Sequence, residues 1–328
     1  MATPTSMTPA TWAAPVHTPA AAPKSGLTLV TEVPLPGPPN RFDYQSVDTA
    51  SGRIYMNHMN AGRTIVFDAN HGRVIGEISG MRRATGVLAV PAHHQVYISS
   101  GGSGNVAIVD DRSLRILARV DDVFFPDGIA YASDADKVFV SDETGGKELV
   151  IDPVRMRGRS LIPLGGEAGN SHYDSVSKCI LVAVQTRNEL VAIDPVSEKI
   201  VQRYHLAGSD HPHGFAIADD ERLAFVTSEE SALLQVLDLR TMRVLSEHRV
   251  GDGPDVLAWD PVWRRLYVAS EGGTLSIFWL DGTTLHPFGE VRADYAHTVS
   301  VDPRTHRVYL PLQNVGGRPV LRIYEPAR

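Results

Sequence analysis

A short phrase that returns three times carries the residue types best suited to chemistry in this chain. It reads FPDGIAY at 125–131, HPHGFAI at 211–217 and GPDVLAW at 253–259, so Asp127, His213 and Asp255 occupy equivalent positions. Carboxylate and imidazole groups bind divalent cations and transfer protons near neutral pH. The phrase therefore predicts a metal or acid–base site, provided that the fold brings its copies together.

The phrase belongs to a repeat that can be counted from the strand-like run that follows it. That run begins at Ile54, Val96, Val138, Ile180, Ala224, Leu266 and Val308. The steps between successive copies are 42, 42, 42, 44, 42 and 42 residues. Regular periods of about 40–45 residues are typical of β-propeller blades.

Each copy has the pattern of four short strands separated by polar turns. β-branched and aromatic residues dominate the strands and helical spacing is absent, which indicates antiparallel sheet. The third strand of five copies ends in an aspartate: Asp68, Asp110, Asp152, Asp194 and Asp238. Because these aspartates recur at the same place in each copy, we interpret them as part of the blade structure rather than as a functional site. The seventh copy supplies only three strands, and LTLVTEVPL at 27–35 supplies a fourth. The prediction is an all-β, seven-bladed propeller of four-stranded antiparallel blades, closed by the N-terminal strand joining the last blade.

The strand phrases VFVSDE, AFVTSE and LYVASE, each followed by a strand that ends in aspartate, resemble the YVTN repeat. From about residue 27 onward the chain resembles the YncE-like seven-bladed propeller proteins of bacteria. The GH and WD pairs of WD40 repeats and the paired glycines of kelch repeats are absent from the sequence. The resemblance implies the fold rather than an activity. Export, common among such relatives, leads us to expect a periplasmic or secreted protein, with the cytoplasm as the alternative.

Composition narrows the classes of function. The chain has 328 residues, 43% hydrophobic and 21% charged, which is ordinary soluble composition. A net charge of −7 argues against a nucleic-acid partner, and no apolar run reaches the ~20 residues of a membrane span. Residues 1–25 are rich in Ala, Pro and Thr and predict a disordered leader, before a single propeller domain over 26–328.

Repeat arithmetic places equivalent residues around one mouth of the central channel, where the loops that precede the innermost strands meet the loops that follow the second strands. The repeated position, which we call the mouth ring, comprises Asp43, Thr85, Asp127, Gly169, His213, Asp255 and His297. The loop after the second strand adds Glu143, Glu229 and Glu271. Acidic and imidazole side chains at one axis predict a divalent cation, Mg, Ca, Mn or Zn. The predicted metal ligands are Asp43, Asp127, His211, His213, Asp255 and His297.

A cation at this mouth could polarise a carbonyl group or activate water. We expect His213, His297 and Glu229 to act as catalytic residues that transfer protons. The predicted substrate-binding residues are Arg41, Arg83, Asn170, His172 and Tyr295. The two arginines could grip a carboxylate. The hypothesis is a hydrolase or lyase that acts on a small carbonyl or lactone-type molecule at the channel mouth.

Other interpretations stay open at the level of sequence. Aspartate before glycine is also ordinary turn chemistry, and the HxH of residues 211–213 lacks the further spacing of a specific metal motif. The second hypothesis is a non-catalytic binding or scaffold propeller of the bacterial cell envelope with a protein partner. A third, copper or haem redox chemistry, is weaker because few histidines converge and no CxxCH is present.

Overall fold

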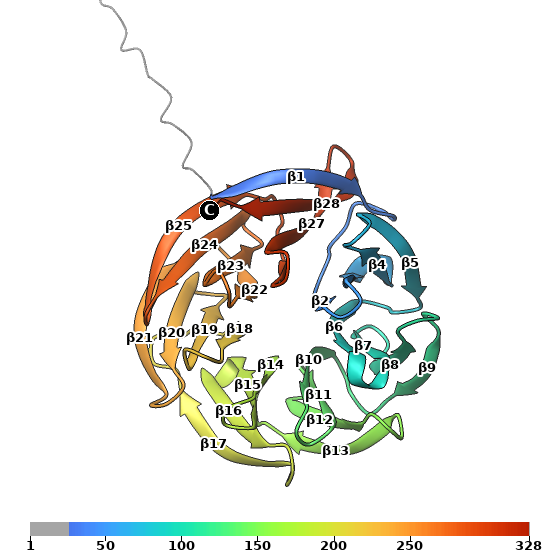
Figure 1. Cartoon of the computed structure of the whole chain (residues 1–328). Coiled ribbons are helices and arrows are strands. Elements are labelled where there is room, and N and C mark those ends of the chain that lie inside the picture. The colour runs from blue at the N-terminus through green and yellow to red at the C-terminus, as the bar shows by residue number, and fades with distance from the viewer. Residues whose placement is uncertain (1–25, 328) are drawn as a thin grey trace, which may run out of the picture.

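Short strands joined by tight turns fill residues 26–327, the part of the chain that the computed structural model describes. They form seven four-stranded antiparallel sheets arranged as a ring around a central axis (Figure 1). The predicted seven-bladed propeller is therefore confirmed. The predicted leader, residues 1–25, lies outside the described residues.

The blades follow one another along the chain, each from its innermost to its outermost strand. The first is β2 (Gln45–Asp48), β3 (Arg53–His58), β4 (Arg63–Asp68) and β5 (Arg73–Ser79). The second is β6 (Ala84–Val90), β7 (Gln95–Ser100), β8 (Asn105–Asp110) and β9 (Ile116–Val120). The third is β10 (Pro126–Ala132), β11 (Lys137–Asp142), β12 (Lys147–Asp152) and β13 (Arg157–Pro163). The fourth is β14 (Ala168–Asp174), β15 (Cys179–Val184), β16 (Glu189–Asp194) and β17 (Lys199–His205).

The remaining blades repeat this order. The fifth is β18 (Pro212–Ala218), β19 (Leu223–Ser228), β20 (Leu233–Asp238) and β21 (Arg243–Arg249). The sixth is β22 (Pro254–Asp260), β23 (Arg265–Ser270), β24 (Thr274–Asp281) and β25 (Thr284–Arg292). The seventh contains β26 (Ser300–Asp302), β27 (Arg307–Val315) and β28 (Arg318–Pro326). Among residues 26–327 the helices are the single turns η1 (Met59–Ala61), η2 (Pro91–His93) and η3 (Gln185–Arg187), and none is long enough to cross a membrane.

The ring closes through the first strand of the chain. β1 (Leu27–Pro34) pairs antiparallel with β28, so the last sheet has the order β1-β28-β27-β26. Figure 1 shows β1 in blue lying along β28 in red. The predicted closure is confirmed, and it covers a strand edge that would otherwise be free to pair with another molecule.

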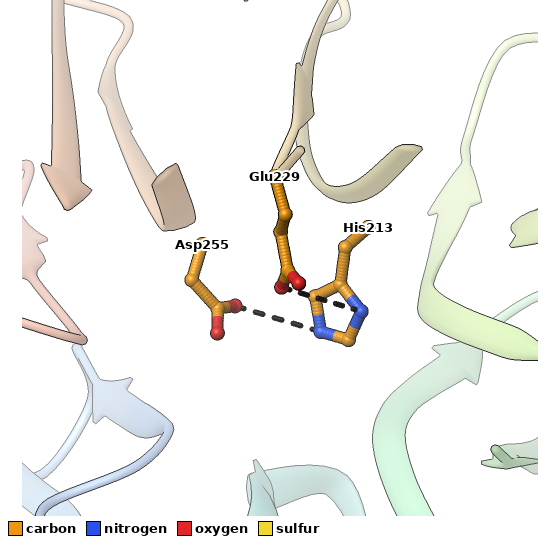
Figure 2. Close-up of side chains that lie close together, drawn as sticks. All are labelled: His213, Glu229 and Asp255. Carbon is orange, nitrogen blue, oxygen red and sulfur yellow. Dashed lines mark ion pairs between the residues drawn. The ribbon is translucent and has the colours of Figure 1, made fainter. Parts of the chain in front are cut away.

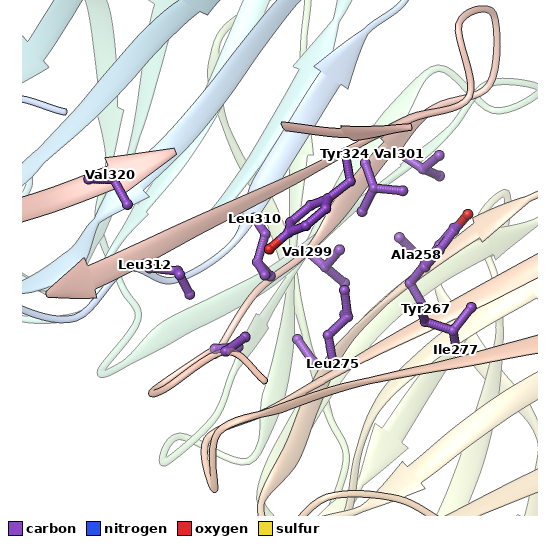
Figure 3. Close-up of a cluster of buried hydrophobic side chains, with 14 residues drawn as sticks. Ala258, Tyr267, Leu275, Ile277, Val299, Val301, Leu310, Leu312, Val320 and Tyr324 are labelled. Carbon is purple, nitrogen blue, oxygen red and sulfur yellow. The ribbon is translucent and has the colours of Figure 1, made fainter. Parts of the chain in front are cut away.

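Adjacent blades pack face to face, and the hydrophobic core lies between them. Middle strands such as β7 are buried at every position, whereas outer strands such as β21 alternate between exposed and half-buried residues. Figure 3 shows one of these clusters, in which Tyr267 and Leu275 of the sixth blade meet Leu310 and Tyr324 of the seventh. Each fully buried side chain of this size contributes roughly 1.5–3 kcal/mol.

The aspartates that end the third strands have the structural role that their regular spacing indicates. Asp152 Oδ1 accepts hydrogen bonds from the backbone N–H groups of Val154 at 3.0 Å and Arg155 at 2.9 Å. Asp194 and Asp238 make the equivalent bonds at the next two turns. These carboxylates satisfy turn backbone at the ends of the blades, which is ordinary turn chemistry.

The phrase that places the mouth ring is a β-bulge in the innermost strand. In β10, Pro126 pairs with Asp142 but Ile129 pairs with Val140, so the innermost strand has one residue more than its partner. The same irregularity occurs in β6, β14, β18 and β22. The turn interpretation of the phrase was therefore wrong. A bulge bends its strand and redirects a side chain, and these bulges include the ring positions.

Neighbouring bulges approach so closely that glycine is required beside several ring residues. A Cβ atom on Gly214 would lie 1.6 Å from the carbonyl oxygen of Asp255, and one on Gly86 would lie 1.8 Å from that of Asp127. Second-strand side chains hold these carbonyl groups: the Ser99 hydroxyl donates to the Asp127 carbonyl oxygen at 2.8 Å. Thr227 makes the corresponding bond to the Asp255 carbonyl oxygen at 3.4 Å, so a second-strand hydroxyl joins the second and fifth blades to the bulge of the next blade.

Candidate metal centre at the channel mouth

The mouth ring lies around a polar cavity of about 330 Å³, which we call the mouth pocket. Six of the seven ring positions line it, and their side chains are 7% exposed or less. These six are Asp43, Thr85, Asp127, His213, Asp255 and His297. The structure thus brings together residues that lie as far apart as 43 and 297 in the sequence.

Carboxylates outnumber the fixed cations of the mouth pocket. Asp43, Asp127, Asp255, Glu143 and Glu229 line it, against Arg41 and Arg83. Crowded carboxylates in a buried site repel one another unless protons or a cation neutralise them. His213 and His297 also line the pocket, and because their pKa values are raised to about 9 and about 10, they supply the balancing positive charge when no cation is bound.

The first of two charged clusters is centred on His297. Its Nδ1 lies 2.8 Å from Glu271 Oε1, and its Nε2 lies 3.0 Å from Asp43 Oδ1 and 3.1 Å from Asp255 Oδ2. Arg41 adds an ion pair of 2.8 Å to Glu271. Burial lowers the pKa of His297, but Asp255 and Asp43 outweigh it and raise the value to about 10. The cluster is consistent with an imidazolium ring held by carboxylates on both sides.

The second cluster contains His213, Glu229 and Asp255 (Figure 2). His213 Nε2 lies 3.5 Å from Asp255 Oδ1, and His213 Nδ1 lies 3.9 Å from Glu229 Oε1. One ligand atom from each of the three residues lies within 4.8 Å of the others, a spacing at which one ion could contact all three. A similar grouping can be drawn from Asp255, Glu271 and His297, so Asp255 belongs to both.

The two clusters differ in how well their polar atoms are satisfied. Both nitrogens of His297 have carboxylate partners. In contrast, His213 Nδ1 and Asp255 Oδ1 are buried and have no hydrogen-bond partner among the described residues. Buried polar atoms without partners are costly, and a bound cation or water is one explanation for them. The second cluster is therefore the stronger candidate for a cation.

Burial and neighbouring charges shift the pKa values of several groups of the mouth pocket. Burial raises the pKa of Asp127 to about 8, with His213 opposing and Asp43 adding to the shift. Burial lowers the pKa of His213, but Asp255 and Glu229 raise it to about 9. Burial also raises the pKa of Glu229, a change that the charge of His213 opposes. Such groups can give or accept a proton at physiological pH.

Tyr44 is a part of the site that the sequence analysis did not identify. Its ring comes from the first blade, and its hydroxyl reaches Asp127 Oδ2 of the third blade and His213 Nε2 of the fifth, both at 3.1 Å. The residue after each ring position is otherwise small or of middle size: Gly86, Gly128, Asn170, Gly214, Val256 and Thr298. A tyrosine at this position was the signal that could have revealed it.

The two predicted arginines lie at the mouth pocket. Arg41 Nη2 lies 3.1 Å from His297 Nε2, beside its ion pair with Glu271. Arg83 stacks on Phe125, with its guanidinium carbon 4.6 Å from the ring centroid. Of the two, Arg83 has no carboxylate partner among the described residues, so it is the better placed to meet a substrate anion.

Two predicted site residues, His211 and Tyr295, do not line the mouth pocket. The imidazole of His211 pairs with Asp210 at 2.9 Å, and Tyr295 is 62% exposed. Both residues have left-handed backbones, with φ of 54° and 60° respectively. Each residue lies two positions before a ring residue, and neither side chain lines the pocket.

Asn170 and His172 lie deeper than predicted. They line a second cavity further along the innermost strands, because they follow the ring position Gly169 by one and three residues. The His172 ring packs edge-on against Phe215, with centroids 4.6 Å apart. Burial lowers the pKa of His172 to about 4, so the imidazole is neutral at physiological pH.

Comparison with known proteins bears on the fold alone. Neither family profiles nor curated proteins match the chain. Among solved structures, the chain is similar to one recorded as Kuenenia stuttgartiensis hydrazine synthase, with a TM-score of 0.74 and 16% identity. The alignment covers 88% of this chain and 96% of that one. The class of protein is a seven-bladed β-propeller with buried His, Asp and Glu groups that could hold a metal.

Proposed function

We propose that the protein is a YncE-like propeller that binds a divalent cation in the mouth pocket and acts on a small carbonyl or lactone-type substrate as a hydrolase or lyase. The observation that supports it most is the pair of buried atoms without a hydrogen bond, His213 Nδ1 and Asp255 Oδ1. They belong to the three-residue cluster that Glu229 completes. Mg, Ca, Mn and Zn all accept carboxylate oxygen, and Zn and Mn also accept imidazole.

The residues of the pocket then have distinct roles. His213, Glu229 and Asp255 would hold the cation, which would supply Lewis acidity toward a carbonyl oxygen. His297 holds Asp255 in place at 3.1 Å and is a positioning residue. Asp127, with its pKa near 8, is the group best suited to transfer a proton at neutral pH. Arg83 would meet an anionic group of the substrate.

The test of this proposal is hydrolysis of a panel of small lactones with and without each added cation. We expect turnover that a chelator abolishes and that Asp127→Asn lowers at least about 100-fold, the usual effect of losing a general acid or base. The matched control is Asp210→Asn, which changes an exposed carboxylate paired with His211. Turnover that persists in chelator, or that Asp127→Asn leaves unchanged, would refute the assigned roles.

A second candidate function, a non-catalytic binding propeller of the cell envelope, is favoured by a different observation. Four valines at turn tips are 58–73% exposed: Val154, Val176, Val196 and Val262. They lie in turns between first and second or third and fourth strands, at the opposite end of the blades from the mouth ring. This candidate would be supported by a protein partner that is captured by the wild-type chain and lost when these valines are replaced, together with an absence of lactone turnover.

A further inference from the structure

The central channel contains a second cavity, of about 490 Å³, which we call the inner chamber. It lies along the innermost strands on the far side of the mouth ring, and Tyr44 is the residue that lines both cavities. The Tyr44 hydroxyl reaches Asp127 and His213 on other blades, so this side chain separates the two spaces. The volume falls in the range of small-molecule sites.

The inner chamber is chemically opposite to the mouth pocket. None of the described residues that line it is an aspartate, glutamate, lysine or arginine. Its one titratable imidazole, His172, has a pKa lowered by burial and is neutral. Aromatic surfaces come from His172 with Phe215, and from Trp259, whose ring lies 5.1 Å from that of Phe225. A charged ligand would lose its hydration there without gaining an ionic partner.

Polar groups without a hydrogen-bond partner among the described residues line the inner chamber, among them Trp259 Nε1 and the side-chain amide of Asn170. Asn170 is 4% exposed and lines the cavity, and its side-chain amide has no hydrogen bond to the rest of residues 26–327. Its neighbour in the strand, Ser171, is bound to Glu148 at 2.9 Å. A buried amide without a protein partner can donate to and accept from a ligand.

We propose that the inner chamber is a binding site for an uncharged small molecule that combines an aromatic ring with an amide or carbonyl group. The ring would pack among Trp259, Phe215 and His172, and the polar group would hydrogen-bond the Asn170 amide. The site is distinct from the proposed cation site, since the described residues that line it include none of the three proposed ligands.

The test uses 2-naphthamide and 2-naphthoate, which share an aromatic body and differ in charge. Isothermal titration of chelator-treated protein should give a dissociation constant for the amide at least about tenfold below that for the anion, because burying an unpaired charge costs more than 1.4 kcal/mol. Equal affinities, tighter binding of the anion, or no binding of the amide would overturn the proposal. Because the protein is metal-free, failure here leaves the cation proposal intact.

Two variants locate the bound amide. Asn170→Ala should raise the dissociation constant of 2-naphthamide about two- to tenfold, the effect of one lost hydrogen bond. Ala89→Phe places a ring in the inner chamber and should abolish binding, whereas Leu117→Phe, on the exposed outer strand of the same blade, should not. Circular dichroism checks that each variant is folded. Amide binding unchanged in folded Ala89→Phe and in Asn170→Ala would show that the chamber is not the site.

Discussion

His213 and His297 occupy the same position of two blades but have different surroundings. His297 has carboxylates on both nitrogens, whereas His213 has a tyrosine hydroxyl on one side and an unpartnered nitrogen on the other. Sequence arithmetic makes the two residues equivalent. Their surroundings differ in the structure because each ring residue contacts the loops of the blades next to its own. His297 is therefore suited to position the neighbouring carboxylates, and His213 is suited to bind a ligand.

The buried charge of His297 predicts how stability depends on pH. Its folded pKa, about 10, exceeds the ordinary value of 6.5, so its stabilising contribution is complete below about pH 6.5 and is lost as pH rises through 10. Urea titrations in the presence of chelator measure the unfolding free energy at pH 7 and at pH 9. The decrease between the two should be about 1–3 kcal/mol smaller in His297→Gln than in the wild-type protein. His211→Gln, an exposed histidine, is the control. An unchanged slope in His297→Gln would contradict the charged cluster.

We expect removal of the Tyr44 hydroxyl to lower the free energy of unfolding. Tyr44→Phe keeps the ring in the channel but deletes the hydrogen bonds to Asp127 and His213. We expect the free energy of unfolding to fall by about 1–2 kcal/mol, since both partners are buried. Tyr295→Phe removes an exposed hydroxyl and should change little. Equal values for the two variants would show that the Tyr44 bonds contribute nothing.

Residue positions could be predicted from the sequence only where the repeat period alone determines them. The ring positions of Asp127, His213 and Asp255 follow from spacing and were placed correctly at one mouth. His211 does not line the pocket, because its imidazole pairs with the neighbouring Asp210, a local contact that spacing does not reveal. Tyr44 was missed because its importance comes from crossing the channel to other blades, a long-range contact that no repeat count contains.

At the scale of elements, the bulged innermost strand is the feature that five of the blades share at their ring positions. Strand types, order and blade number follow from hydrophobic patterning and turn residues, so the sequence predicts them well. The bulge does not follow, because the phrase with Asp127 and Gly128 is equally typical of a turn. The structure shows that glycine there serves the close approach of the next blade rather than a positive φ.

This close approach predicts a large effect of a single methyl group. In Gly214→Ala the new Cβ would meet the Asp255 carbonyl oxygen at 1.6 Å, and backbone must shift. We expect about 3 kcal/mol of destabilisation and weaker cation binding. The matched control is Gly158→Ala on outer strand β13, where the nearest atom is a valine methyl at 3.3 Å. Similar unfolding free energies for the two variants would contradict the packing argument.

At the scale of the whole molecule, the ring depends on a strand taken from the other end of the chain. Deleting residues 1–34 removes β1 and exposes the edge of β28. We expect a lower melting temperature and self-association in light scattering, because an unpaired edge strand templates further pairing. Deleting residues 1–25 alone retains every described strand and serves as the control. A monomeric 35–328 chain with an unchanged melting temperature would contradict closure through β1.

The cation is the centre of the functional account, and metal content measures it most directly. Protein purified without chelators should contain about one divalent metal ion per chain by mass spectrometry. His213→Ala should lose it, whereas His211→Ala, two residues away but outside the mouth pocket, should retain it. The contradictory result is a metal-free wild-type protein whose melting temperature does not rise with added Mg, Ca, Mn or Zn, or a metal that persists in His213→Ala.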